Sequence, residues 1–470
     1  MKKKFIIPAL LVSILALGGL ASCDNNQSDD TLNIVVIDAD YGHDWINTMR
    51  DDYIAAHPDT KIKVTALYES ESLIQQHLAS SKNNDDLYIS VGATWKSNAA
   101  TNSFASLDDL LEETVDNVKV KDKVSDEFKD SIYFTKSDGS KHCYRLPFTS
   151  GLGGIFYNTK MFEQNGWQIP TTFDELLELC KTIKNAKIAR PGDLDGTTAV
   201  SPFIYTGRNT DYFDYLVFDW WAQIAGKENI QDFLKYDSAD NFDVTKSETY
   251  NALKTATKRW KELFGPDAGY CVDGYNNKDA GDAQKDFVNG YAAMMVNGDW
   301  LYNASLNYTG FEDTFELGIM KTPVLSEAKA EYADTSYIIG EDQYIAIPAT
   351  SKKQDLAKDF IKYMISDEGC KTFVKKAHGF LAYDADYSSI EITDKFLLSE
   401  IKLRNSYTSK FTNFSSDRKY LCNNIDIWGT SANRPFLSVL NGAQANLDTS
   451  FVNIYSTVSA RWQDWTDKSK

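Results

Sequence analysis

Short apolar runs alternate with amphipathic segments from residue 31 onward, and this alternation predicts an α/β body. Residues 32–37 form a near-continuous β-branched run, which is typical of a strand buried on both faces. Large apolar side chains then recur at helical spacing over residues 45–54, and His57-Pro58-Asp59 ends this helix. Residues 62–66 alternate as a second strand, so the body opens with a β-α-β unit.

A second apolar stretch, GYAAMMVNGDWL at residues 290–301, organises the middle of the chain. Its uncharged run predicts a buried strand, and Asn297-Gly298-Asp299 predicts a polar turn because Gly and Asn tolerate positive φ. The turn would display Trp300 at the end of a strand, where open α/β folds bind small ligands. Trp300 could equally be a core residue, since most tryptophans are largely buried.

Other strand ends also carry aromatic or acidic side chains. Tyr41, Asp44 and Trp45 follow the first strand, and Trp95 follows a strand that ends near Gly92. In a parallel sheet these ends meet at one edge, so we expect a ligand site there. Trp45 has an alternative role as the first-turn anchor of its helix.

Several later elements can be predicted from their patterns. Cys143–Phe148 and Gly151–Asn158 predict two strands separated by a turn, and Thr172 with Glu175 predicts a capping box at a helix start. Amphipathic helices are expected over residues 250–264 and 354–365. In the adjacent pair Trp220-Trp221, at most one ring is expected to face a ligand, and core packing is the favoured interpretation.

The N-terminus is a targeting segment and is excluded from the fold. Lys2-Lys3-Lys4 precede an apolar run over residues 5–20, and Leu20-Ala21-Ser22-Cys23 resembles the bacterial lipobox, in which the cysteine is lipidated. We therefore expect a signal peptide at 1–22, lipid on Cys23 and a flexible polar tether at 23–30. The alternative, an uncleaved anchor, fits poorly because the run is shorter than the roughly 20 residues that span a bilayer.

Composition narrows the range of functions. The 470 residues carry a net charge of −18, which opposes binding to nucleic acid. Aromatic residues make up 13% of the chain and supply flat apolar faces with polar edges. The five histidines lack the spacing of a zinc enzyme, the six cysteines form no metal or redox motif, and no phosphate-binding or nucleophile motif occurs. We expect no cofactor, no metal and no catalytic residue.

Four motifs resemble the extracellular solute-binding proteins of ABC importers, the superfamily that includes maltose-binding protein. Residues 290–300 are similar to the family's G-x-A-A-M-x-x-x-G-x-W segment, with Asp299 where many relatives have Pro. Residues 157–162 resemble Y-N-x-x-x-F, and residues 170–176 resemble P-x-T-x-D-E-L. Residues 340–369 resemble the block that begins G-G, with Glu341 in place of the second Gly.

This resemblance implies a two-lobed periplasmic-binding-protein type II fold, α/β in class, with a ligand cleft between lobes joined by crossover strands. We expect lobe 1 at residues 31–149 plus about 341–385, and lobe 2 at 150–340 plus about 386–470. Ligand would bind in the cleft and favour the closed state through a hinge. The resemblance also implies a monomer, tethered by lipid outside the cytoplasmic membrane, that delivers ligand to a membrane permease.

Aromatic and acidic residues at the expected cleft favour a neutral sugar or oligosaccharide as ligand, because Trp and Tyr stack on sugar rings while carboxylates accept from hydroxyls. A polyamine or another small cation is the alternative within transport. An exported carbohydrate hydrolase is the alternative of a different class, because a pair of carboxylates at the right separation would suffice. The candidate ligand contacts are Tyr41, Asp44, Trp45, Trp95, Asp299, Trp300, Glu341 and Asp342.

Overall fold

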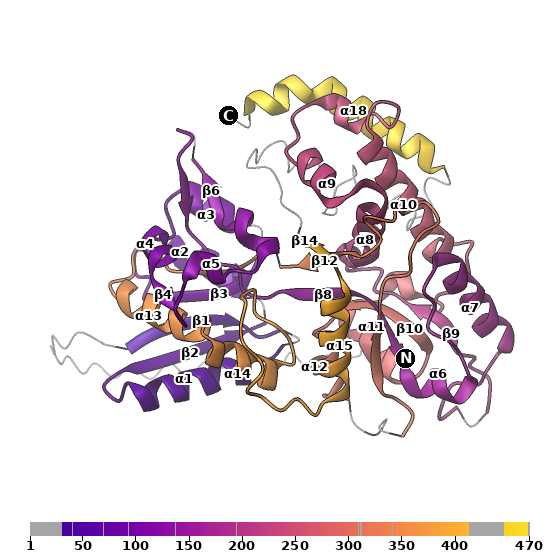
Figure 1. Ribbon diagram of the computed structural model, residues 1–470, viewed down its shortest axis with the longest axis horizontal. Coiled ribbons are helices and arrows are strands. Elements are labelled where there is room, and N and C mark those ends of the chain that lie inside the picture. Colours follow the sequence, from indigo (N-terminus) through magenta and orange to yellow (C-terminus); the bar gives the residue numbers. More distant parts are fainter. Residues whose placement is uncertain are drawn as a thin grey trace, which may run out of the picture.

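The strands of the protein form two main sheets, one in each half of the molecule (Figure 1). We call these halves lobe 1 and lobe 2. The computed structural model describes residues 31–412 and 446–468, except for positions 40, 69, 93, 137, 194, 309, 311–312 and 341. The predicted Cys23 lipidation, Glu341 and Cys422 therefore lie outside the described residues.

The sheet of lobe 1 has the strand order β13-β3-β1-β2. Strands β1, β2 and β3 are parallel, and β13 joins antiparallel to β3 from a much later part of the chain. The carboxyl ends of the three parallel strands therefore share one edge. The strand bounds are β1 Thr31–Ile37, β2 Lys61–Leu67, β3 Leu87–Val91 and β13 Gln343–Ala346.

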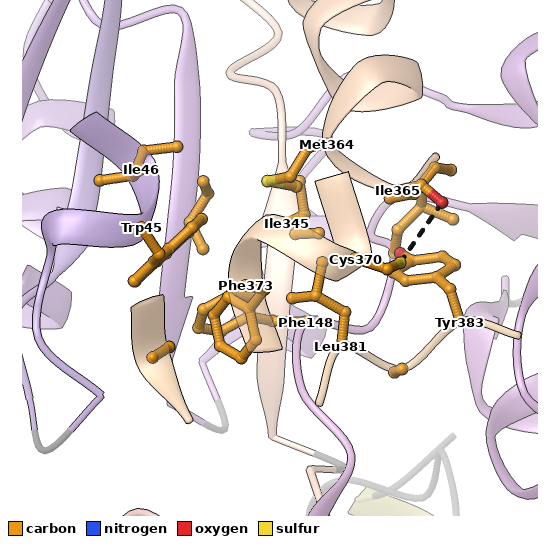
Figure 2. Close-up of a cluster of buried hydrophobic side chains, with 14 of the residues drawn as sticks. Trp45, Ile46, Phe148, Ile345, Met364, Ile365, Cys370, Phe373, Leu381 and Tyr383 are labelled. Atoms are coloured by element: carbon orange, nitrogen blue, oxygen red, sulfur yellow. Dashed lines mark hydrogen bonds between the residues drawn. The ribbon is translucent and has the colours of Figure 1, made fainter. Parts of the chain in front are cut away.

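Strand β1 is buried on both faces, as its continuous β-branched sequence predicts. Leu32, Ile34 and Val36 belong to the core that includes helices α1 (Asp44–Ala56) and α14 (Asp367–Ala377). Val35 belongs to a second core on the opposite face, with helices α2 (Ser70–Leu78) and α3 (Trp95–Ala100). Figure 2 shows part of the first core, where Trp45 of α1 packs beside Phe148 and Phe373.

The sheet of lobe 2 has the order β14-β12-β8-β10-β9, and β11 also pairs with β8. In the core of this lobe, helix α8 (Asp214–Ala225) packs against β12 and against helix α10 (Glu248–Phe264). Its strands are β8 Gly151–Asn158, β9 Ser201–Ile204, β10 Ala292–Gly298, β11 Leu317–Met320, β12 Thr335–Ile339 and β14 Ser409–Phe411.

Most helices of lobe 2 lie on the outer faces of this sheet (Figure 1). The C-terminal helix α18 packs on α10 and on a short 3-10 helix, Ala239–Phe242. The helices of this lobe are α6 Thr159–Asn165, α7 Phe173–Ala186, α8 Asp214–Ala225, α9 Lys227–Phe233, α10 Glu248–Phe264, α11 Ala280–Val288, α12 Leu301–Ser305, α15 Lys395–Ser406 and α18 Leu447–Lys468.

Smaller elements complete lobe 1, including two short hairpins, β4-β5 and β6-β7. Within the described part of the chain, no helix combines the length and apolarity needed to cross a membrane. The bounds are α2 Ser70–Leu78, α3 Trp95–Ala100, α4 Asp108–Glu112, β4 Thr114–Val115, β5 Val118–Lys119, α5 Val120–Lys123, β6 Tyr133–Thr135, β7 Lys141–Cys143 and α13 Gln354–Met364.

Two segments cross between the lobes near the centre of the molecule (Figure 1). Strand β8 pairs through its first two residues with β12 and through the rest with β10 and β11. Just before β8, Thr149 bridges to Leu381. The second segment connects β12 to β13 through Gly340, which has φ of +148°. The expected two-lobed α/β fold with crossover strands is therefore observed.

The capping box predicted at residues 172–175 is confirmed. Thr172 accepts from the Glu175 amide at 3.3 Å, and the Glu175 carboxylate accepts from the Thr172 amide at 3.1 Å. Of the two strands expected between Cys143 and Asn158, Gly151–Asn158 is confirmed as β8. The strand expected over Cys143–Phe148 is wrong, because β7 ends at Cys143 and residues 144–150 make only isolated bridges. The polar turn expected at 297–299 is also wrong: β10 continues to Gly298, whose partner in β8 is Gly153.

Trp220 and Trp221 are both fully buried in α8. The Trp220 indole donates to the Pro323 carbonyl at 3.0 Å, and the Trp221 indole donates to the Thr249 carbonyl at 2.7 Å. Neighbouring indoles can both lie in the core because α8 is covered on more than one side. Core packing, the favoured interpretation of this pair, is confirmed for both rings.

Candidate ligand-binding site

A cavity of about 380 Å³ lies between the two lobes, at the carboxyl ends of β1 and β2. Lobe 1 contributes the loop after β1, Tyr68 after β2 and Lys376 of α14. Lobe 2 contributes Asn303, which is in α12, and Leu306 and Asn307 just beyond it. We call this space the interlobe cavity. Its walls are Asp38, Ala39, Tyr41, Gly42, His43, Asp44, Tyr68, Asn303, Leu306, Asn307 and Lys376.

Two large apolar side chains on the rim of the interlobe cavity are unusually exposed. Tyr68 is 76% exposed and Leu306 is 52% exposed, and they come from different lobes. Exposed apolar groups around a concavity are typical of binding surfaces. Polar partners lie beside them, since Asp38, Asp44, Asn303 and Asn307 also line the space.

Tyr41 separates this cavity from an aromatic group centred on Trp300. The Tyr41 ring meets the Trp300 ring edge-on, with centroids 6.2 Å apart, and it also contacts Phe373 at 5.5 Å. Gly379 makes room for the Tyr41 ring, because a Cβ at that position would lie 2.4 Å from the Tyr41 Cε1 atom. Tyr41 is therefore held in place by α14 and the turn that follows it.

Trp300 is partly buried, and it lies two residues after the end of β10 and immediately before α12. Tyr212 and Tyr215 also present their rings at steep angles to it, with centroid distances of 6.2 and 5.8 Å. Such edge-to-face contacts hold a ring more firmly than area burial alone. The result is a partly exposed indole, fixed by tyrosines from both lobes.

Asp299 lies beside Trp300 but is completely buried. Its carboxylate accepts from the Tyr41 hydroxyl at 2.6 Å, from the Leu152 amide at 3.0 Å and from Arg404 Nη2 at 2.6 Å. Arg404 also donates to the Ser150 carbonyl at 2.7 Å. Asp299 thus makes internal hydrogen bonds and does not open onto the cavity.

Glu400 is a second buried carboxylate on the same guanidinium. It accepts from Arg404 Nε at 2.7 Å, whereas its other oxygen, Oε2, has no hydrogen-bond partner among the described residues. Burial raises the pKa of Glu400 well above its usual range, and the nearby Asp299 carboxylate adds to the shift against the charge of Arg404. We call Tyr41, Asp299, Glu400 and Arg404 the interlobe cluster.

Two of the predicted tryptophans lie in the core of lobe 1. Trp45 is 1% exposed, and its indole donates to the Gly42 carbonyl at 3.0 Å. Trp95 is 2% exposed, and the Arg145 guanidinium lies 4.4 Å from its ring centre. Trp45 therefore occupies the position expected of a helix anchor, and neither side chain lines the interlobe cavity.

The remaining predicted contacts are dispersed. Asp44 is exposed in the first turn of α1 and lines the interlobe cavity. Asp342 is partly buried at the crossover, where its carbonyl accepts from the Gly92 amide at 2.8 Å. Of the predicted set, the structure brings Tyr41, Asp44, Asp299 and Trp300 to one region between the lobes.

Sequence reasoning did not select Tyr68, Tyr212 or Tyr215 as site residues. Tyr68 follows β2 as Tyr41 follows β1, so the strand-end argument could have found it. Tyr212 lies in a short 3-10 helix, Thr210–Phe213, and Tyr215 lies in the first turn of α8. Both are far from Trp300 in sequence, and no local signal marks them.

A second cavity and a search for metal ligands do not point to another candidate site. A larger cavity of about 960 Å³ lies at the amino ends of β1, β2 and β3, on the edge opposite to the interlobe cavity, and is lined by polar residues such as Asp86 and Lys353. Among the described residues, no group of three or more His, Cys, Asp or Glu side chains could hold a metal ion.

Comparison with known sequences gives matches that extend over most of the chain. A profile of the family described as "Bacterial extracellular solute-binding protein" matches residues 40–370. The diacetylchitobiose binding protein DasA of Streptomyces coelicolor is 25% identical over 384 residues, covering 78% of this chain and 79% of that protein. A multiple sugar-binding protein of Streptococcus mutans is 25% identical over 256 residues, covering 53% and 51% of the two chains.

Solved structures show the same fold. A chitin oligosaccharide binding protein superposes with a TM-score of 0.67 at 16% identity, covering 94% of this chain and all of that one (100%). The GacH receptor of Streptomyces glaucescens also gives a TM-score of 0.67 at 16% identity, covering 94% and 99%. These similarities establish the two-lobed architecture.

Proposed function

Because this chain belongs to the family of bacterial extracellular solute-binding proteins, we propose that it captures a sugar or oligosaccharide between its lobes and delivers it to the permease of an ABC importer. The observation that carries the proposal is the partly exposed Trp300, fixed by tyrosine edges beside a cavity that both lobes line. A family of receptors gives no reason to expect catalysis.

The chemistry of the site suits a neutral polyhydroxylated ligand. Indole and phenol rings offer flat faces to the apolar side of a sugar ring, and the candidates are the partly buried Trp300 and the exposed Tyr68. Hydroxyl groups need both donors and acceptors, which Asn303, Asn307 and Asp44 provide. The mixed lining contains both Asp and Lys, so it does not resemble a site for a strongly charged ligand.

Relatives support the same ligand class. The curated relatives are described as binding diacetylchitobiose and multiple sugars, and a solved structure of the same fold is described as binding chitin oligosaccharides. At 25% identity the pocket residues are free to differ, so we extend the class of ligand to this chain and not the particular sugar.

We further propose that the protein is a lipoprotein, lipidated at Cys23 and held on the outer face of the cytoplasmic membrane. The support is the sequence Leu20-Ala21-Ser22-Cys23 after a basic and apolar segment, together with the extracellular character of the family. Two acyl chains anchor a protein stably, whereas one does not.

A thermal-shift screen tests the ligand class, because a ligand that binds only the folded state raises the melting temperature. The chain from Asp24 onward would be screened against mono- and oligosaccharides, polyamines and amino acids. We expect a rise with one class of sugar and none with polyamines. A rise with polyamines alone would replace the sugar by a cation, and shortening of an oligosaccharide during incubation would replace the receptor by a hydrolase.

A further inference from the structure

The interlobe cluster contains a hydrogen bond between the two lobes that ends on the Asp299 carboxylate. Asp299 belongs to lobe 2, where it follows β10, and Arg404 reaches it from α15 of the same lobe. Tyr41 comes from lobe 1, after β1, and its hydroxyl donates to the other oxygen of the same carboxylate at 2.6 Å. Figure 1 shows α15 beside the crossover strands, close to where the lobes meet.

We propose that the interlobe cluster is a latch that holds the lobes, without ligand, in the relative arrangement seen in this structure, with the Tyr41 hydroxyl as its releasable contact and Asp299 as a positioning residue. This inference rests on the proposed function, in which opening and closing of the lobes accompany capture. It also assigns Asp299 a role other than the ligand contact predicted from its sequence position.

Other contacts hold each side of the latch, and one of them also crosses between the lobes, because the Arg404 guanidinium lies 4.6 Å from the ring centre of Phe380 in lobe 1. On the lobe 2 side, the Leu152 amide and Arg404 hold the Asp299 carboxylate, and Arg404 is itself tied to the Ser150 carbonyl. On the lobe 1 side, Phe373 and Gly379 confine the Tyr41 ring. A change in the angle between the lobes would therefore act on the bond between Tyr41 and Asp299.

Breaking that bond is unfavourable because of where the carboxylate lies. Asp299 is completely buried, and a buried carboxyl group that loses a donor keeps its desolvation penalty without the compensating bond. Bonds to an ionised acceptor are also stronger than those between neutral groups. The arrangement seen here therefore has a contact that would be lost if the lobes moved apart, and a binding-competent arrangement that is already populated raises apparent affinity.

Glu400 supplies a matched control within the cluster. Two buried carboxylates face one guanidinium, and Glu400 Oε2 has no donor, which fits a protonated acid at this position. A glutamine has the same shape and no charge. We therefore expect Glu400→Gln to leave the latch intact, in contrast to changes at Tyr41.

The test measures the distance between the lobes without any ligand. Nitroxide labels at Ser106→Cys and Lys258→Cys, exposed positions on lobes 1 and 2, would be read by pulsed electron paramagnetic resonance. The protein would be the chain from Asp24 onward, which retains every described residue, with Cys271 and Cys422 replaced by serine. The variant Tyr41→Phe removes the hydroxyl and keeps the ring contacts.

We expect one short distance for the parent protein and for Glu400→Gln. For Tyr41→Phe we expect about a ten-fold shift of the population toward a longer distance, as for loss of a bond to a buried charge. Tyr53→Phe is the control, because Tyr53 donates to Asp359 at 2.7 Å within lobe 1 and its loss should not move the lobes. Unchanged melting curves would show that the variants are folded.

An unchanged distance in Tyr41→Phe, or an open parent protein, would overturn the latch. A shift in Tyr53→Phe equal to that in Tyr41→Phe would also overturn it, because the effect would then be general destabilisation. The measurement uses no ligand, so a sugar screen that finds no binding would count against the proposed function and leave this result to stand separately.

Discussion

Asp219 is a completely buried carboxylate in α8, at the contact with β12. It accepts from the Tyr337 amide at 2.5 Å and from the Thr322 hydroxyl. Burial raises the pKa of Asp219 from 3.8 to about 7, although these two donors oppose the shift. The folded protein therefore binds a proton at this site over a range of pH in which the unfolded chain has released it.

This shift predicts a loss of stability with rising pH. The contribution of Asp219 to the free energy of unfolding is fully present below pH 3.8 and is lost as pH rises toward about 7. We expect Asp219→Asn, which mimics the protonated acid and cannot titrate, to remove this dependence on pH, so that the stability curves of variant and parent differ by a slope of up to about 1.4 kcal/mol per pH unit. Urea unfolding of both proteins between pH 4 and pH 8 measures it, and parallel curves would contradict the assignment.

Trp300 is predicted to affect binding more than folding. Because the indole is only partly buried, we expect Trp300→Ala to reduce the free energy of unfolding by less than the about 3–5 kcal/mol typical of a core tryptophan. Affinity for the sugar found in the screen should fall at least about ten-fold, as expected for loss of an aromatic anchor. Calorimetric titration and urea unfolding measure the two effects.

Trp462 offers a matched control for this substitution. It is also partly buried, but it lies in α18 and packs toward Phe242, with ring centroids 6.5 Å apart. Trp462→Ala should lower stability and leave affinity unchanged. If both variants bound sugar as the parent does, Trp300 would be a packing residue only.

The crossover between β12 and β13 depends on Gly340. Its φ of +148° disfavours a side chain, and a Cβ would lie 2.3 Å from the Thr149 carbonyl oxygen in the neighbouring crossover. We expect Gly340→Ala to cost at least about 1–3 kcal/mol of stability, the usual range for one strained residue, because the backbone oxygen cannot move aside cheaply. Thermal and urea unfolding would measure the loss.

Gly166 separates backbone strain from the steric clash. It ends α6 with φ of +67°, and nothing lies within 4 Å of its Cβ position. Gly166→Ala should therefore lower the free energy of unfolding only by the cost of a left-handed conformation, about 1 kcal/mol. Equal losses in the two variants would mean that the crossover relaxes around the new methyl group.

Local patterns were sufficient for elements whose stabilising contacts are close in sequence. The capping box at Thr172 is one such case, and the burial of β1 on both faces is another. Asp299 was not predictable in this way, since its partner Arg404 is 105 residues away. The sequence suggests an acidic loop at Asp299, whereas the distant guanidinium allows the carboxylate to be buried.

The site residues that could be predicted from the sequence are those at the ends of strands. Tyr41 and Trp300 stand at strand ends, and the order of parallel strands brings such ends together. Trp45 and Trp95 also follow strands, but Trp45 is the second residue of α1 and Trp95 is the first residue of α3. Both side chains turn back into the core. The direction of the helix that follows a strand thus decides whether a side chain at the strand end lies in the cleft or in the core. That direction depends on packing partners that are remote in sequence.

The net charge of the whole protein distinguishes the two candidate ligand classes. A protein of charge −18 attracts any cation over long distances, and salt screens this attraction. A neutral sugar has no net charge to be attracted. The interlobe cavity adds a local contribution of the same sign through Asp38 and Asp44, partly offset by Lys376.

We therefore expect the affinity for the ligand to be nearly independent of ionic strength. Between about 20 mM and 500 mM sodium chloride the Debye length falls from roughly 20 Å to about 4 Å. This change would weaken the affinity for a polyamine about ten-fold or more, whereas the affinity for a neutral sugar would change less than about two-fold. Calorimetric titration at both salt concentrations measures this. A steep salt dependence would mean that the carboxylates of the cavity carry the binding energy, and the cationic ligand would then replace the sugar in the proposal.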